Sequence, residues 1–181
     1  ICTAQALLAT MAGFYAVYHG PEGIRTIAER IHSIAVFLEE SINRLGYKQV
    51  NAQYFDTLRF ALPDTISAQQ IRTIALSKEV NLRYFKNGDV GMSIDETTDI
   101  AAVNVLLSIF AIAAGRDWEK TSDVPMASSI SAEMKRQSAY LTHEVFNKYH
   151  TETEMMRYIK RLDRKDISLA HSMISLGSCT M

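Results

Sequence analysis

Apolar residues at helical spacing are the feature of this sequence that most constrains its fold. They recur every three or four positions and therefore share one face of a helix: Ile24, Ile27, Ala28, Ile31, Ile34, Ala35, Leu38, Ile42 and Leu45. Pro21, which suits the first position of a helix, precedes them, and Gly46 predicts a left-handed end. The pattern predicts a long amphipathic helix with one buried face, which follows another helix over residues 2–18.

A strand and a capped helix come next. Residues 54–62 alternate in polarity, which is typical of a half-buried strand, and three apolar residues face one side: Leu58, Phe60 and Leu62. Ser67 and Gln70 have the spacing of a capping box, which predicts a helix that runs to about Lys78.

Residues 86–88, with the sequence Lys-Asn-Gly, predict a hairpin with a three-residue loop and a left-handed Gly88. This loop length pairs Tyr84 with Val90 and puts the apolar residues of both strands on one face. A two-residue turn would place them on opposite faces. A strongly apolar helix should follow, capped by Thr97 or Thr98, and end near residue 114.

Residues 1–115 thus predict an α+β domain whose helices pack on one face of a small antiparallel sheet. Residues 116–140 are polar and rich in serine, and we interpret them as a linker. Residues 141–181 predict a helical segment, with a short helix capped by Thr142 and a second capping box at Thr151 and Glu154.

Composition excludes several classes of protein. The 181 residues carry a formal net charge of −1, with 19 basic and 20 acidic residues and no long block of one sign. Nothing therefore favours binding to nucleic acid or an anionic membrane. The longest apolar run has about 15 residues, against the roughly 20 needed to span a bilayer. Two cysteines, Cys2 and Cys179, predict a reducing compartment and no disulfide framework.

The histidines give few metal or catalytic signals. His143 and Glu144 resemble the start of a zinc motif, but Asn147 stands where the second histidine ligand would be, so we expect no metal site. We expect His19 and His32 at the surface and leave His171 open. We expect core packing for two groups of residues, the aromatic residues Phe14, Tyr15 and Tyr18 and the Met155-Met156 pair. A cofactor box is the alternative.

Small residues with hydroxyl or thiol groups surround Gly177 in the run from His171 to Met181. A backbone nest at Gly177, with Ser178 and Thr180 as donors, is suited to a carboxylate or phosphate, and an ordinary surface loop is the alternative. Cys179 either lines such a site or is a small buried hydrophobic residue. His150 either hydrogen-bonds at a helix start or faces a ligand channel.

Several segments together resemble the glycine cleavage system P-protein family, the pyridoxal-phosphate-dependent glycine decarboxylases. The resemblance covers essentially the whole chain, and its most specific motif is Leu-Gly-Ser-Cys-Thr-Met at residues 176–181. The other matching segments are residues 1–9, 18–23, 93–97, 141–143, 146–152, 156–158 and 165–169. Ser175 departs from the family, which has proline there.

The resemblance implies an internal fragment of a larger enzyme with the aminotransferase-like fold type I. Residues 1–115 would be the small domain that ends the cofactor-free half, residues 116–140 a linker, and residues 141–181 the opening of the catalytic half. The cofactor lysine follows a histidine in this family, and this chain has no His-Lys pair. The fragment alone is therefore expected to be inactive. In the full protein the following residues would line the site: His150, Gly177, Ser178, Cys179 and Thr180.

The implied oxidoreductase, a glycine dehydrogenase, releases carbon dioxide from glycine and passes the aminomethyl group to the lipoyl arm of H-protein. The other implied partners are the remaining domains of the chain and a second copy in a homodimer. The implied compartment is the bacterial cytoplasm or the mitochondrial matrix. A module without chemistry, serving regulation or oligomerisation, is the alternative function.

Overall fold

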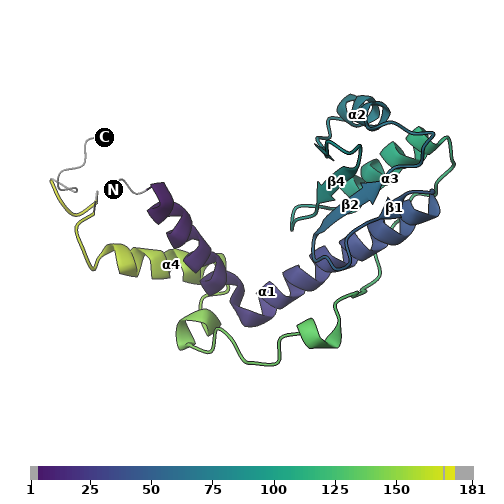
Figure 1. Ribbon diagram of the computed structural model, residues 1–181. Helices are drawn as coiled ribbons and strands as arrows, with labels where there is room; N and C mark the ends of the chain where they lie inside the picture. Colours follow the sequence, from purple (N-terminus) through teal and green to yellow (C-terminus); the bar gives the residue numbers. More distant parts are fainter. Residues whose placement is uncertain (1–3, 169, 174–181) are drawn as a thin grey trace. The chain divides into compact units, whose positions relative to one another are not determined.

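The computed structural model describes residues 4–168 and 170–173 and divides the chain into two compact units. One unit comprises residues 26–136, and the other takes the chain up to Arg25 and from Gln137 onward. Helix α1 (Ala4–Arg44) contributes to both. Figure 1 labels the helices and strands. None of the helices in the described residues is both long enough and apolar enough to cross a bilayer.

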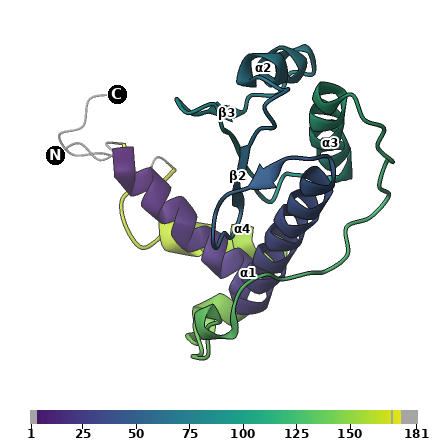
Figure 2. The same cartoon turned by 45° about the vertical axis from the view of Figure 1, so that its right-hand side comes forward.

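The unit of residues 26–136 is an α+β structure around one four-stranded antiparallel sheet (Figures 1 and 2). The strands have the order β1-β2-β4-β3. After the later part of α1 the elements are β1 (Lys48–Gln49), β2 (Thr57–Ala61), α2 (Ala68–Ser77), β3 (Arg83–Tyr84), β4 (Val90–Ser93), α3 (Ile100–Ala114) and the 3₁₀ turn η1 (Ala132–Met134). The predicted α+β class is confirmed, and β1 is a strand that the sequence pattern did not reveal.

One face of the sheet and the helices α1 and α3 make the core of this unit. Leu58 and Phe60 of β2 are fully buried against Ile42 of α1 and Ile109 of α3. On the other face Thr57 and Ser93 are exposed and hydrogen-bond each other at 2.9 Å. The helices therefore cover a single face of the sheet, as the alternating pattern of the strand predicts.

The hairpin has the predicted three-residue loop. Tyr84 pairs with Val90, and the Phe85 N–H donates to the Asp89 carbonyl at 2.9 Å. Gly88 has a φ of +91°, so its left-handed conformation is also confirmed. Phe85 covers Gly91, where a Cβ atom would lie 3.0 Å from the ring. An aromatic ring that lies over a glycine in this way protects a weak position of a sheet.

Helix caps agree with the sequence in part. Ser67 caps α2, Thr151 caps α4 (Glu152–Asp163), and each side chain accepts from the backbone N–H three residues on. The predicted cap of α3 at Thr97 or Thr98 is wrong. Asp99 caps that helix and accepts from Ala102 N–H at 2.8 Å, because both threonines bond to the Asp95 carboxylate instead.

The short helix near residue 142 is a 3₁₀ turn, η2 (Glu144–Asn147), and Thr142 does not cap it. His143 is the cap, since its Nδ1 accepts from the Val145 N–H at 3.2 Å. In α4 the apolar stripe is only half buried. Met155 is 8% exposed, whereas Met156 is 68% exposed, so the prediction that both methionines are core is wrong for Met156.

The chain after α3 packs on the α+β unit, although it has little regular structure. Trp118 and Val124 lie against its core. Asn104 of α3 holds Thr121 by two bonds of 2.9 Å, one to its carbonyl and one from its N–H. Side-chain amides that copy backbone hydrogen bonding in this way replace a missing strand partner.

Candidate functional site

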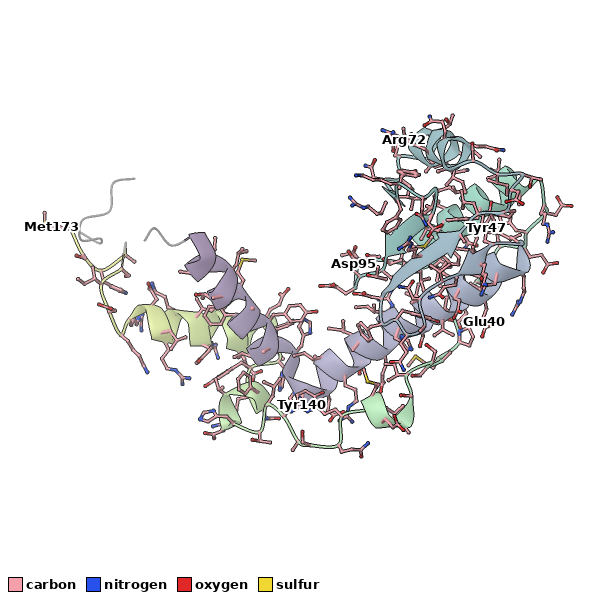
Figure 3. All side chains as sticks on the ribbon, in the orientation of Figure 1. Glu40, Tyr47, Arg72, Asp95, Tyr140 and Met173 are labelled. Atoms are coloured by element: carbon pink, nitrogen blue, oxygen red, sulfur yellow. The ribbon has the colours of Figure 1, made fainter. Side chains whose placement is uncertain are left out.

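A break in α1 at Gly20 organises the unit that contains residues 137–173. Gly20 has a φ of +64° and a ψ of −178°, and Pro21 follows it at the predicted first helical position. Two side chains from the later segment bind the backbone around the break. His150 Nδ1 lies 2.7 Å from the Tyr18 carbonyl. The hydroxyl of Tyr140, which is labelled in Figure 3, donates to the Pro21 carbonyl at 2.7 Å.

Only glycine fits at this break. A Cβ atom on Gly20 would lie 2.7 Å from His150 Cε1 and 2.7 Å from the Phe146 carbonyl oxygen. Cβ atoms do not make contacts that short, and a backbone oxygen cannot turn away as a flexible side chain can. The positive φ adds strain for any L side chain. The glycine is therefore required both by its dihedral angle and by the close approach of His150.

A cavity of about 340 Å³ opens beside the break. Its lining combines ring nitrogens, a carboxylate, an amide and an aromatic ring: Tyr18, His19, Gly20, Pro21, Glu22, Asn147 and His150. Asn147 is fixed, because its Nδ2 donates to the carbonyls of Leu141 at 3.2 Å and His143 at 3.1 Å. Polar groups of this kind suit a small polar ligand.

The hydrogen bond of His150 determines which nitrogen the cavity can use. A carbonyl only accepts, so Nδ1 must carry the proton that it donates to Tyr18. In the neutral ring Nε2 is then a hydrogen-bond acceptor, and in the charged ring it is a donor. The hydrogen-bonding reading of His150 is confirmed, and its role in lining an active site stays a prediction.

The run around Gly177 lies outside the described residues. Its four predicted site residues therefore have no structural description: Gly177, Ser178, Cys179 and Thr180. His171, which the sequence left open, is exposed.

Within residues 4–168 and 170–173 no cluster of three or more His, Cys, Asp or Glu side chains is placed to hold a metal ion. Glu144 pairs with Lys148 instead, and this hydrogen bond lowers the pKa of its carboxyl below the ordinary value. Glu144 begins the turn η2, Lys148 follows it, and both side chains are exposed, so the pair is a surface ion pair of small energetic weight.

Aromatic rings stack between the first part of α1 and α4. Tyr149 lies parallel to Tyr158 with ring centroids 4.3 Å apart, and Phe14 meets Tyr158 edge-on at 6.3 Å. The Arg161 guanidinium lies over both tyrosine rings, at 5.5 and 5.2 Å, and donates to the Tyr149 hydroxyl. These contacts favour packing rather than a cofactor box for Phe14, whereas Tyr15 is exposed, so its predicted place in the core is wrong.

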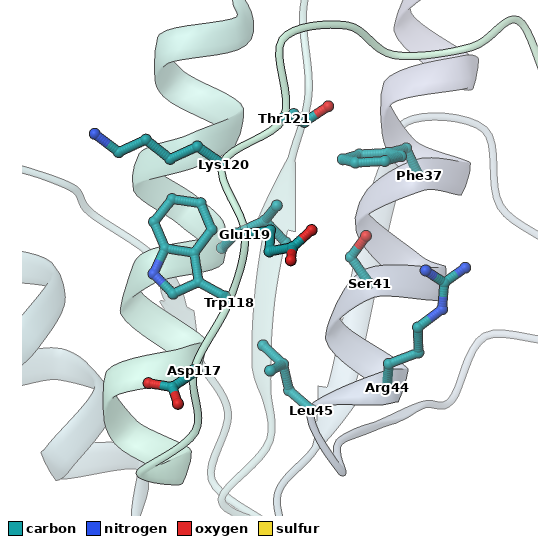
Figure 4. A pocket seen from close by; sticks show the side chains of 10 residues that line it. Phe37, Ser41, Arg44, Leu45, Asp117, Trp118, Glu119, Lys120 and Thr121 are labelled. Carbon is teal, nitrogen blue, oxygen red and sulfur yellow. The ribbon is translucent and has the colours of Figure 1, made fainter.

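A second cavity, also about 340 Å³, lies in the α+β unit between α1, α3 and residues 117–121 (Figure 4). Phe37 and Trp118 form aromatic walls, and in Figure 4 the Glu119 carboxylate lies between Trp118 and Ser41. No signal in the sequence indicated this cavity, because its walls come from two parts of the chain that are far apart, residues 37–45 and residues 107–121.

The sequence also missed His32. We expected it at the surface, but it is only 2% exposed, and this expectation is wrong. His32 and Ser33 are adjacent on α1 and both bind the chain near residues 127–129. A buried polar pair that interrupts the apolar stripe was the signal that was available.

The chain is similar over its full length to known proteins. The model of the glycine cleavage system P-protein family matches residues 1–110. Over its full length the chain is 82% identical to a glycine dehydrogenase (decarboxylating) of Bacteroides fragilis strain YCH46 and 78% identical to that of Bacteroides thetaiotaomicron. The corresponding Flavobacterium johnsoniae protein is 49% identical. In each case the chain spans 19% of the relative's length. The chain belongs to the glycine cleavage system P-protein family.

Proposed function

We propose that this chain is a part of a glycine dehydrogenase (decarboxylating) that shapes the active site without supplying the cofactor lysine. The observation that carries the proposal is the 82% identity over the whole chain to a relative of that name. The complete enzyme would release carbon dioxide from glycine and transfer the aminomethyl group to the lipoyl arm of H-protein. The remaining domains of the same chain would complete the enzyme, which would act as a homodimer. The bacterial relatives support a cytoplasmic location.

Within that enzyme we assign three segments. Residues 1–115 would form the small domain of the cofactor-free half, residues 116–140 a linker, and residues 141–181 the opening of the catalytic half. The small antiparallel sheet with helices on one face supports a fold of the aminotransferase-like type I.

The cofactor pyridoxal phosphate supplies the electron sink for decarboxylation, and it requires a lysine and a carboxylate partner for its ring nitrogen. The described residues do not fit it by themselves. Their lysines are exposed except for the half-buried Lys78, and none of them lines the cavity at Gly20. The isolated chain should therefore form no lysine adduct. Borohydride trapping after mixing with pyridoxal phosphate tests this, and a stoichiometric adduct that survives unfolding would contradict it.

The chain's own contribution would be to position and bind. We assign the lining of the assembled site to five residues: His150, Gly177, Ser178, Cys179 and Thr180. For His150 the support is its ring, which the Tyr18 carbonyl holds in one orientation beside a polar cavity. For the run at Gly177 the support is its chemistry, small residues with hydroxyl donors around a glycine.

Substitutions in the full-length enzyme test this assignment. Ser178→Ala and Thr180→Val each remove one donor to a charged ligand, which should cost about ten- to a hundred-fold in glycine-dependent carbon dioxide exchange. Ser178→Ile should cost more through steric exclusion. His150→Gln should lower the exchange while Gln fills a similar volume. Full activity in all four variants would show that these residues only connect or pack, and equal loss of activity and stability would show a structural role.

A second candidate function is an interaction module without chemistry. The exposed apolar residues on the first part of α1 favour it, since Leu7 and Met11 are 66% and 57% exposed and share one helix face with the exposed Tyr15. Sedimentation of the isolated chain distinguishes the two. Self-association that Met11→Lys abolishes would support the module, whereas a monomer would not.

A further inference from the structure

Two buried polar side chains of α1 hold a short strap, which we define as residues 126–130. The Ala127 N–H donates to Ser33 Oγ at 3.0 Å, and the Ser129 N–H donates to His32 Nε2 at 3.0 Å. His32 and Ser33 are each 2% exposed. The strap itself is neither strand nor helix, so these two side chains provide the backbone partners that regular structure would otherwise provide.

The two contacts differ in their response to protons. Ser33 does not titrate, and its hydroxyl can donate to the Glu29 carbonyl at 2.7 Å while it accepts from Ala127. His32 is bonded on both sides. Its Nδ1 lies 2.8 Å from the Phe55 carbonyl, so Nδ1 must be the donor, and Nε2 must be unprotonated to accept from Ser129.

Only one state of the ring satisfies both neighbours. In the neutral Nδ1–H tautomer every contact joins a donor to an acceptor. A proton on Nε2 would face the Ser129 N–H, so that two donors would oppose each other across 3.0 Å. Ser129 Oγ lies 3.3 Å from Nε2 and could accept that proton, but the Ser129 N–H would still have lost its own acceptor.

We propose that His32 is a proton-sensitive clasp, which holds the strap on the α+β unit while its ring is neutral and releases the strap when the ring is protonated. Because the neutral ring is the bound form, protonation must favour the released form by linkage. The strap should therefore be tightly held at neutral pH and should loosen as the pH falls.

The test of this proposal requires that no other group beside the His32 ring changes its protonation between pH 7.5 and pH 5.0. Phe55 stacks on it with an interplanar angle of 2°, and Tyr54 lies 5.8 Å away. Burial, followed by a hydrogen bond to Glu39, raises the pKa of Tyr54 to about 12, so this hydroxyl stays neutral. Of the acidic residues, Glu29 lies three positions before His32 in α1, Asp56 follows Phe55 in the chain, and Glu39 accepts from the Tyr54 hydroxyl.

Release would change the connection between the two units of the chain. The strap precedes Gln137, where the other unit of the chain resumes. On its N-terminal side the chain is held by Val124, which packs against the core, and by Thr121 on Asn104. Protonation of one imidazole would thus loosen the segment that follows Val124.

Peptide-resolved hydrogen exchange of the intact protein tests the clasp. Between pH 7.5 and pH 5.0 the protection of residues 126–130, corrected for the intrinsic exchange rate, should fall roughly tenfold or more, the effect of losing one hydrogen bond at a charged group. His32→Gln keeps a donor and an acceptor but does not titrate, so its strap protection should not depend on pH. His32→Phe should show a released strap at both pH values, with protection of residues 34–44 retained.

Two further variants serve as controls. His143 also accepts a backbone N–H, but it is exposed, so His143→Gln should leave the pH response of the strap unchanged. Glu39→Gln removes the linked carboxylate and should also leave it unchanged. Wild-type strap protection that is independent of pH, or an equal pH response in His32→Gln, would overturn the proposal even if His32→Phe fails to fold.

Discussion

Each of the two units of this protein is stabilised internally by a different kind of interaction. Residues 26–136 enclose an apolar core in which Leu38, Phe60 and Phe110 are fully buried. In the other unit Val17 and Met155 are the buried hydrophobic side chains among the described residues. Its contacts are directional: a histidine and a tyrosine that bind backbone carbonyls, and a stack of tyrosine rings. Burial tolerates many sequences, whereas directional contacts depend on single atoms.

The first prediction concerns the core. Phe60→Ala removes a fully buried ring and should lower the free energy of unfolding by about 3–5 kcal/mol. Hydrogen exchange should increase throughout residues 26–136, because the core is one cooperative cluster. As a matched control, Leu76→Ala on the exposed side of α2 should change the stability by less than roughly 0.5 kcal/mol. Similar losses in both variants would show that burial does not dominate this unit.

The second prediction concerns the break in α1. Gly20→Ala imposes strain of roughly 1–3 kcal/mol from the positive φ, and the contact with Phe146 adds to it. Chemical shifts of His150 and Tyr18 should report the loss of their hydrogen bond. Gly13 is the control, since it lies in the same helix with no atom near its Cβ position. Gly13→Ala should stabilise the helix by roughly 0.5–1 kcal/mol. Opposite signs for the two glycines would confirm that geometry, not helix propensity, decides the effect.

The third prediction concerns a directional contact inside the apolar core. The Tyr47 hydroxyl donates to the Phe110 carbonyl at 2.8 Å, and burial raises the pKa of Tyr47 to about 12. Tyr47→Phe leaves a buried carbonyl without this donor and should cost about 1–2 kcal/mol.

The raised pKa of Tyr47 also has a consequence at high pH. The folded state holds this proton more tightly than the unfolded state, whose tyrosine titrates near pH 10. The stabilising contribution is complete below pH 10 and is lost as the pH rises toward 12. Denaturant unfolding at pH 9 and pH 11 should show this fall, and the fall should be smaller in Tyr47→Phe. An identical fall in both proteins would contradict the assignment.

The smallest expected effect is that of a helix cap. Asp99→Ala should destabilise the start of α3 by about 1 kcal/mol, since Asp99 accepts from the Ala102 N–H. Thr97→Ala should cost less, because its hydroxyl bonds to Asp95 in an exposed turn and caps no helix. Thermal unfolding of the two variants decides between Asp99 and the cap expected from the sequence.

Local patterns predicted the elements whose signals lie close together in the chain. The hairpin is the clearest case, because loop length and the alternation of apolar residues admit one register, and Tyr84 pairs with Val90 as expected. The cap of α3 was missed by one or two residues. Three neighbouring hydroxyl and carboxylate side chains can each cap a helix, and only the turn at Asp95 decides which of them is free to do so.

The candidate site was predicted less completely. His150 was recognised, but Gly20 was recognised only as a helix stop. Its steric role depends on Phe146 and His150, more than a hundred residues later in the chain. His32 was placed at the surface because a histidine on a helix is usually solvated. Its burial depends on Phe55 and Ser129, which the fold brings to it from two different segments.

The sequence by itself determined the α+β class, the single buried face of α1, the hairpin register and the family, because periodicity and short motifs act over a few residues. Tertiary structure alone decided which polar groups are buried and what they bind. A hydrogen bond depends on the distance and direction of both atoms. For His32 and His150 the partners are backbone atoms. Because backbone groups have the same chemistry at every residue, the residue types do not reveal which of them a histidine will bind.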